Sequence, residues 1–263
     1  MMDVAAFPRA TPTEDPDATY SIEVDNLHKS FGSAHILTGL NLNFVEGSVT
    51  TVLGPSGTGK SVLIKHIVGL LQPDKGEVRV FGKAMNKLKG EELFEMRENF
   101  GLLFQDGALF GSMNIYDNVA FPLRKHTNLD EDVIGQIVIE RCREVGLEGA
   151  LGKMPNEVSG GMRKRAGFAR SLVLNPKIVM FDEPGGGLSR EEANRLGDLI
   201  LKVPEVTGAT TLVIDHGVDL IARICSQTLV LDFGRRVAFG DTRAVLEDPK
   251  VKAAYLGIEE AAT

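Results

Sequence analysis

Residues 54–61 read GPSGTGKS, and they stand between the apolar run VTTVL at 49–53 and the run VLIKHIVGLL at 62–71. This stretch fits the pattern GxxxxGK[ST] in full, and the flanking runs predict the strand and the helix that such a phosphate-binding loop requires. The glycines let the loop wrap closely, so that backbone N–H groups point at phosphate oxygens. Lys60 then contacts the β- and γ-phosphates, and the Ser61 hydroxyl binds Mg²⁺.

A second motif, IVMFDEP at 178–184, supplies the acids that a phosphate loop needs. Its apolar residues predict a buried strand, so that the following carboxylates lie at the C-terminal edge of a sheet, beside the loop. Asp182 is the expected Mg²⁺ partner. Glu183 is placed to orient or deprotonate an attacking water.

A third motif, EVSGGMRKR at 157–165, has the features of another anion-binding helix start. Ser159, Gly160 and Gly161 offer a hydroxyl, unobstructed backbone N–H groups and the positive end of a helix dipole. The basic triplet at 163–165 has two interpretations. It forms either a solvated helix face or a set of cations that support a phosphate or a dimer contact.

Strand and helix patterns alternate along much of the chain, which predicts a mostly parallel sheet covered by helices. The helical pattern EDVIGQIVIERCREVGL lies within a stretch, about 106–166, that has no strand runs and is predicted to be an inserted helical sub-domain. Strands are predicted in SIEVDNL, LNLNFVEG, VTTVLG, EVRVFG, GLLFQ, KIVMFDEP, TTLVIDH and TLVLDFG, and further helices in GEELFEMREN, EEANRLGDLILK and GVDLIARIC.

From about Ser21 to Gly240 the chain resembles the nucleotide-binding subunits of ABC transporters. The motifs follow the order of that family. Phe31 in KSFG matches the aromatic residue that stacks on adenine, and Gln105 in LLFQDG matches the glutamine that links Mg²⁺ to the helical sub-domain. VSGGM at 158–162 stands where LSGGQ is usual, and His216 in TLVIDH stands at the switch-histidine position.

The resemblance implies an α/β P-loop NTPase fold: a RecA-like, mostly parallel sheet with flanking helices, an antiparallel β part and the helical sub-domain. It implies an ATPase with ATP and Mg²⁺ as cofactors, and two subunits that pair head to tail, so that each signature closes on the ATP of the other. The implied catalytic residues are Glu183, His216 and Gln105, and the Mg²⁺ partners are Ser61, Gln105 and Asp182. The implied ATP-binding residues are Phe31, Gly54, Pro55, Ser56, Gly57, Thr58, Gly59, Lys60 and Ser61, and the signature acting in trans consists of Ser159, Gly160, Gly161 and Met162.

One branch of the family fits best. SGGMRKRAG at 159–167, with LFQDGALFGSMNIYDN and AFPL, resembles the ATPases of Mce- and Mla-type lipid transporters. Met162 replaces the usual Gln of the signature and loses one hydrogen-bonding group, which is worth about 0.5–1.5 kcal/mol. Ser189 replaces an Asp that ties the two ATP sites together in the family, so the effect of this change on the ATPase rate and its coupling stays open.

Three other functions stay open at this point. The tail AAYLGIEE has some similarity to ATPases of branched-chain amino-acid importers, so an importer of amino acids or other small solutes is one alternative. A soluble ABC ATPase of translation or DNA repair is another, although those proteins generally carry two ATPase halves or large insertions. Ser189 motivates the third, a catalytically weak, regulatory member of the family.

The composition bears on the location and the partners of the subunit. A net charge of −7 argues against a nucleic-acid partner, and no apolar run is long enough to span a membrane. The expected site is therefore the cytoplasmic face of the inner membrane, reached through integral permease subunits, with Mce-like proteins as further partners. Residues 1–20 are predicted to be a flexible lead-in, 21–240 the nucleotide-binding domain, and 241–263 a helical tail. Cys142 and Cys225 are expected to be buried free thiols.

Overall fold

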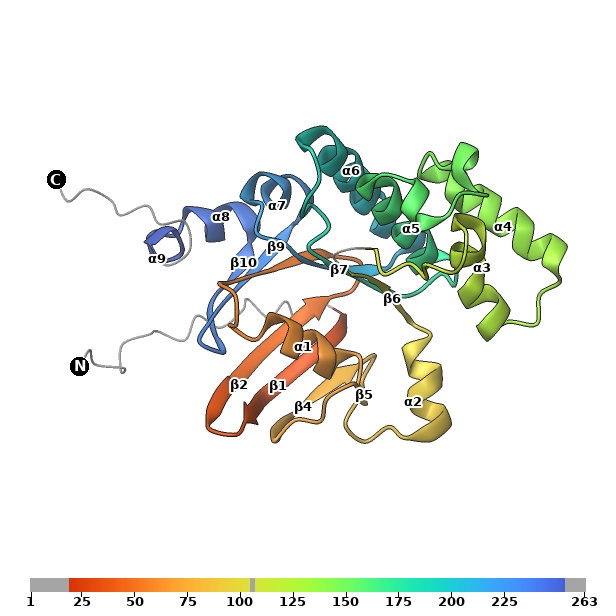
Figure 1. Cartoon of the computed structure of the whole chain (residues 1–263). Coiled ribbons are helices and arrows are strands. Elements are labelled where there is room, and N and C mark those ends of the chain that lie inside the picture. Colours follow the sequence, from red (N-terminus) through yellow and green to blue (C-terminus); the bar gives the residue numbers. More distant parts are fainter. Residues whose placement is uncertain (1–18, 105–106, 254–263) are drawn as a thin grey trace, which may run out of the picture.

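A computed structural model describes residues 19–104 and 107–253, and Figure 1 shows their arrangement. A mainly parallel sheet forms the centre of the molecule. Its strand order is β10 (Arg235–Asp241), β9 (Gln227–Asp232), β3 (Val49–Leu53), β8 (Thr210–Ile214), β7 (Ile178–Asp182) and β6 (Phe100–Leu103). Strand β10 pairs antiparallel with β9, and the other neighbours are parallel.

The parallel strands are short apolar runs because helices cover both of their faces. Every residue of β3 and of β8 is buried. The loops after β3, β7 and β8 leave the sheet at the same, carboxyl edge, where ligands of open α/β sheets bind. This edge brings together the phosphate loop, the two acids and the histidine motif that the sequence predicted.

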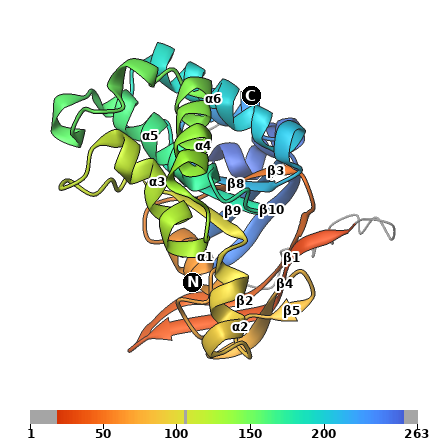
Figure 2. The same ribbon diagram turned by 90° about the vertical axis from the view of Figure 1, so that its right-hand side faces the viewer.

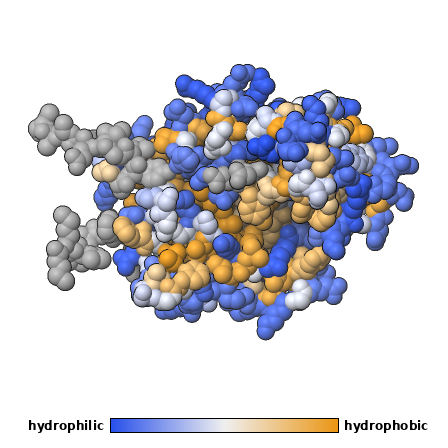
Figure 3. Space-filling view, in the orientation of Figure 1, coloured by the Kyte–Doolittle hydropathy of each residue, from blue (hydrophilic) through white to orange (hydrophobic). Residues whose placement is uncertain are grey.

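A second, antiparallel sheet packs below the first in Figure 1. Its order is β2 (Ala34–Val45), β1 (Tyr20–Phe31), β4 (Lys75–Val80) and β5 (Lys83–Ala84). Helix α1 (Lys60–Ile67) joins the two sheets, because its buried Leu63 and Ile67 belong to the same hydrophobic core as Phe44 of β2 and Met180 of β7. Figure 3 shows apolar side chains gathered near the centre of this face and a largely hydrophilic outer rim.

The helical region lies to one side of the central sheet, as Figure 2 shows from the second direction. It contains α3 (Ile115–His126), α4 (Glu131–Glu144) and α5 (Gly160–Leu172), with 3-10 turns at Glu148–Ala150 and Pro155–Glu157. Its core is continuous with that of the central sheet. The remaining helices are α2 (Gly90–Arg97), α6 (Arg190–Thr207), α7 (Val218–Ile224), α8 (Thr242–Glu247) and α9 (Pro249–Val251).

The predicted fold class is confirmed, and differences from the sequence prediction are local. The helix predicted to run through residues 62–71 ends at Ile67, because Gly69 takes a positive φ of 70° and the chain turns there. Strand β10 and helix α3 were not predicted as separate elements. Helix α5 continues past residue 166 to Leu172. The final residues of the expected helical tail lie outside the described residues.

Both cysteines are free thiols buried in the core, as predicted. Burial raises the pKa of the Cys142 thiol to about 11 and that of Cys225 to about 12. Within the described parts of the chain, no helix has the length and apolar character that crossing a bilayer requires.

Candidate functional site

The phosphate loop joins the buried strand β3 to helix α1. Gly59 immediately precedes the helix with a φ of 100°, and a Cβ added there would lie 2.8 Å from Leu37 Cδ2. Only glycine therefore fits this position without strain. Pro55, Ser56 and Gly57 form the exposed tip of the loop, where their backbone faces solvent and a ligand has access.

Lys60 lies between the loop and the acids of β7. Its ammonium group donates hydrogen bonds to the carbonyl oxygens of Gly54 at 2.6 Å and Pro55 at 2.8 Å. Burial lowers the pKa of Lys60, while the negative charges of Glu183 and Asp182 act in the opposite direction. The lysine is thus held at the mouth of the loop as a cation, which suits a triphosphate.

Asp182 ends β7, and Glu183 begins the loop that follows. Burial, and then the charge of Glu183, raise the pKa of the Asp182 carboxyl, whereas Lys60 lowers it. An acid in this position is under-compensated when ionised, and a divalent cation would remove that cost. With the exposed hydroxyl of Ser61 at the first turn of α1, the oxygen donors at this edge fit Mg²⁺.

Glu183 has an unusual backbone. Its φ is 47°, in the left-handed region that residues other than glycine rarely adopt. Its N–H donates to the carbonyl oxygen of Ile214 at 2.7 Å, which extends the β7–β8 ladder by one bond. Non-glycine residues held in such conformations cluster at functional sites, so the strain supports a functional role for Glu183.

The signature motif begins helix α5. Ser159 is the N-cap, and its hydroxyl accepts a hydrogen bond from the Met162 N–H at 3.2 Å. Gly160 is exposed, and Gly161 is buried so close to Glu192 of α6 that a Cβ would collide with that carboxylate. The Met162 side chain packs against the hydrophobic core of the helical region. It therefore fills space where a Gln would present an amide.

The histidine motif follows β8. His216 is exposed, with 69% of its side-chain surface accessible, whereas Asp215 is buried. One carboxylate oxygen of Asp215 accepts from the N–H groups of His216 at 2.7 Å and Gly217 at 2.9 Å. The other accepts from the N–H of Gly185 at 2.8 Å. One side chain therefore connects the histidine loop to the loop that follows β7.

Comparisons with known proteins agree with this geometry. The family model described as ABC transporter matches residues 37–186. The chain belongs to the ABC transporter ATP-binding family. It is 46% identical to the "Probable ribonucleotide transport ATP-binding protein mkl" of Mycobacterium tuberculosis, over 93% of this chain and 68% of that protein. It is 39% identical to the "Intermembrane phospholipid transport system ATP-binding protein MlaF" of Haemophilus influenzae, over 88% of each.

Solved ABC cassettes have the same fold. CbiO1 of Clostridium perfringens, part of the CbiONQ transporter complex, superposes with a TM-score of 0.80 at 29% identity, over 89% of this chain and 95% of that one. A dimeric cassette in a post-hydrolysis state with ADP and phosphate superposes with a TM-score of 0.78 at 27% identity, over 84% and 99%. The ABC subunit described here is thus an ATPase that energises a transporter.

Phe31 is the aromatic residue predicted to stack on adenine. Phe31 ends β1, is 50% exposed, and has the Lys29 ammonium 5.6 Å from its ring centroid. The ring is therefore accessible for stacking on a base.

Gln105, predicted as a catalytic and Mg²⁺ residue, lies outside the described residues. Helices α1 and α5, which carry the phosphate loop and the signature, lie in separate parts of the subunit (Figure 1).

Ser189 is engaged within its own chain. It is the N-cap of α6, where its hydroxyl donates to the Glu192 carboxylate at 2.9 Å, and the two residues form a capping box. Hydrogen bonds from the backbone and side chain of Ser189 lower the pKa of Glu192. Serine at this position therefore stabilises the start of α6.

Two side chains, those of Lys164 and Asp215, bond to the backbone of the loop after β7, and the sequence did not predict these links. Lys164 is buried, so the solvated-face interpretation of the basic triplet is wrong for this residue. Its neighbours Arg163 and Arg165 also donate to backbone carbonyl oxygens, those of Val158 at 3.0 Å and Val145 at 2.7 Å. The helical period offered a signal, because Lys164 shares a face of α5 with buried residues three and four positions away.

Proposed function

We propose that this ABC ATPase energises the transport of phospholipids or similar hydrophobic compounds. The observation that carries the proposal is the similarity to the phospholipid-transport protein MlaF, which extends over 88% of both chains. Met162 adds support, because SGGM at 159–162 resembles the signatures of Mce- and Mla-type lipid transporter ATPases. Mce-like proteins that handle the lipid are then expected partners.

Ribonucleotides are a second candidate substrate class. The identity to mkl is higher, at 46%, and that protein's name refers to ribonucleotide transport. The match covers 68% of mkl, however, whereas the match to MlaF covers nearly the whole of both chains. The match that covers 88% of both chains favours the lipid assignment over the more identical but partial match.

Reconstitution decides between the two substrates. The subunit and its permease are placed in vesicles that contain a fluorescent phospholipid, with a Glu183→Gln complex as the inactive control. We expect ATP-dependent movement of the lipid and faster ATP hydrolysis when phospholipid is added. Stimulation by a pyrimidine ribonucleotide, with no lipid movement, would instead support the second candidate.

Within each site the residues have distinct proposed roles. Lys60 and the loop amides hold the phosphates, and Glu183 orients the attacking water. Asp182 and Ser61, together with Gln105, would hold Mg²⁺, which would neutralise phosphate charge. The proposed role of His216 is to contact the transferred phosphate.

The dimer is proposed to be a head-to-tail pair of these subunits. Ser159, Gly160 and Gly161 stand at the N-terminus of α5, and their own phosphate loop belongs to a different part of the fold. A second copy would bring its ATP to this helix start, where N–H groups and the helix dipole favour an anion. A solved bacterial ABC cassette that is dimeric supports the pairing of two such subunits.

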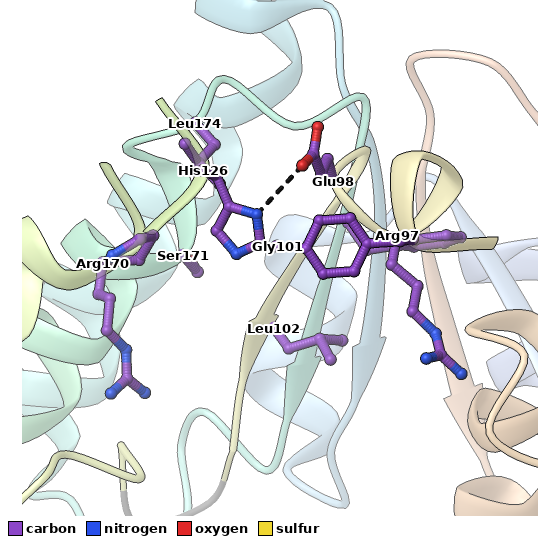
Figure 4. A pocket seen from close by; sticks show the side chains of 11 residues that line it. Arg97, Glu98, Gly101, Leu102, His126, Arg170, Ser171 and Leu174 are labelled. Carbon is purple, nitrogen blue, oxygen red and sulfur yellow. Dashed lines mark hydrogen bonds and ion pairs between the residues drawn. The ribbon is translucent and has the colours of Figure 1, made fainter. Parts of the chain in front are cut away.

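The permease contact is proposed to lie where α2, β6, α3 and α5 meet. A cavity of about 360 Å³ opens there, and Figure 4 shows His126, which is hydrogen-bonded to Glu98 at 3.1 Å, together with Arg170 and Leu174 at its wall. The Arg170 guanidinium lies 5.7 Å from the ring centroid of Phe110, an exposed side chain that is not itself part of the cavity wall. The wall also includes the apolar side chains of Phe94, Phe100 and Leu102, and apolar side chains of this kind anchor a partner helix in a groove.

Phe110→Asp is expected to release the subunit from permease-containing membranes. Phe110 is 43% exposed, and its ring centroid lies 4.9 Å from that of Phe121, so the charge would enter an exposed apolar pair next to Arg170 of the cavity wall. ATP binding should not change, because the phosphate loop is elsewhere in the fold. The measurement is co-purification with the permease, with Leu129→Asp as a control at a similarly exposed apolar position.

Retention of the folded Phe110→Asp subunit by the permease would contradict this assignment of the groove. Leu109 is partly buried and packs against the core of the helical region, so its substitution is a poorer test. Binding through a permease would place the subunit on the cytoplasmic face of the membrane.

A further inference from the structure

The backbone of residues 183–187 is held from two sides by side chains that the described site does not use. This segment follows β7 and reads EPGGG. Its three glycines carry no side chains that could fix the segment by packing, and glycine backbones have the most conformational freedom to lose. Other parts of the molecule must therefore hold the segment in place.

Lys164 holds the segment from the side of the signature helix. Its side chain is 5% exposed, and its ammonium group donates to the carbonyl oxygens of Glu183 at 2.8 Å, Pro184 at 3.0 Å and Gly186 at 2.6 Å. These hydrogen bonds are charge-assisted and largely screened from water, which makes them strong. One of them acts on the carbonyl of Glu183 itself, the residue with the left-handed φ of 47°.

Asp215 holds the same segment from the loop that follows β8. Its buried carboxylate accepts from Gly185 N–H and also from the N–H groups of His216 and Gly217. A Cβ added to Gly185 would lie 3.0 Å from Asp215 Oδ2 and 3.1 Å from Leu220 Cδ2. The absence of a side chain at position 185 is therefore what lets the Asp215 carboxylate approach the backbone.

We propose that Lys164 and Asp215 are positioning residues for hydrolysis, which together hold the segment 183–187 so that the Glu183 carboxylate and His216 keep a fixed relative position. This proposal rests on the role assigned to Glu183 above. Gly185 and Asp215 form a matched pair, in which the glycine leaves space for the acid and the acid orders the glycine. Lys164 adds a direct connection from the signature helix to the base of its own subunit.

Such positioning affects the chemical step more than nucleotide binding. Neither Lys164 nor Asp215 contributes to the phosphate loop, so ATP affinity should be retained when either side chain is removed. A misplaced base costs rate because small displacements of a reacting group are amplified in the barrier. Loss of either residue should therefore lower kcat and leave KM nearly unchanged.

The test uses the complete complex with its permease. Lys164→Met keeps the length and apolar stem of the side chain but removes its three donors, and it is expected to lower kcat at least tenfold with KM within twofold of wild type. Lys164→Arg, which restores donors, should recover part of that loss. Lys202→Met makes the same chemical change at an exposed position of α6 and should leave both constants unchanged.

A double-mutant cycle tests the matched pair. Gly185→Ala should lower kcat about tenfold in the wild-type background but by a clearly smaller factor in an Asp215→Ala background, where the carboxylate is absent and only the contact with Leu220 remains. Equal losses in the two backgrounds would overturn the Gly185–Asp215 link. Because this cycle does not involve Lys164, it stays informative if the Lys164→Met protein is too unstable to purify.

Glu183→Gln distinguishes a failure of the assigned base, Glu183, from a failure of the positioning role of Lys164. If Glu183→Gln is inactive and Lys164→Met has wild-type kcat while still binding ATP, the positioning role of Lys164 is wrong and the proposed base stands. If Glu183→Gln hydrolyses ATP normally, the assignment of the base fails, and the positioning proposal fails with it. Thermal melting and ATP binding on every variant identify a loss of activity that comes from unfolding.

Discussion

Glu183→Gln lowers kcat for ATP hydrolysis by about 10²–10⁴-fold and leaves ATP affinity unchanged, if Glu183 is the residue that orients or deprotonates the attacking water. Gln has nearly the shape of Glu, so the surrounding hydrogen bonds persist. The substitution removes the negative charge and the capacity to accept a proton. The phosphate loop and Lys60 are untouched, so nucleotide still binds.

The same variant is expected to accumulate as an ATP-bound dimer. Closure depends on the γ-phosphate that bridges two subunits, and this phosphate persists when hydrolysis stops. Steady-state ATPase assays and light scattering with excess ATP measure the two effects. Glu191→Gln is a matched control, since Glu191 is 77% exposed on α6 and pairs with Arg195. Wild-type turnover by Glu183→Gln would contradict the assignment of Glu183 as the residue that activates the attacking water.

Lys60→Ala has the second large effect, a loss of ATP affinity. A hydrogen bond to a charged group is worth about 1.5–3 kcal/mol, which corresponds to roughly 10–100-fold in the dissociation constant. The loss reaches the upper end because the partly buried ammonium group also offsets the charges of Asp182 and Glu183, which the substitution leaves in place.

Calorimetric titration with ATP measures this loss directly. Lys65→Ala is the control, because Lys65 is an exposed lysine on the same helix. Unchanged affinity in Lys60→Ala would exclude residues 54–61 as the nucleotide site, whatever the ATPase rate.

The sequence predicted correctly those parts of the fold whose residues are close together in the chain. The phosphate loop is one continuous segment, so its strand, loop and helix follow from local pattern, and the strands before Asp182 and His216 follow from apolar runs of ordinary length. These local elements suffice to predict the edge of the sheet where the site lies, because parallel strands bring their carboxyl ends together.

Long-range contacts explain what sequence reasoning missed. The helical period places Lys164 on the buried face of α5, but it does not indicate that its ammonium group donates to carbonyl oxygens of a loop about twenty positions later. Asp215 resembles an ordinary polar residue after a strand until β7 and β8 pair and bring Gly185 within hydrogen-bond distance. The sequence shows only that Ser189 replaces the usual Asp of the family. The structure shows in addition that Ser189 is the N-cap of α6.

The burial of both thiols has a practical consequence for experiments on this subunit. Cys142 and Cys225 are the only cysteines in the chain, and their raised pKa values leave a very small thiolate fraction at neutral pH, about 10⁻⁴ or less. A maleimide fluorophore therefore reacts selectively with a cysteine introduced at an exposed position such as Val206, which is 72% exposed on α6. Energy transfer between two subunits labelled there reports their approach on adding ATP, without first removing either native cysteine.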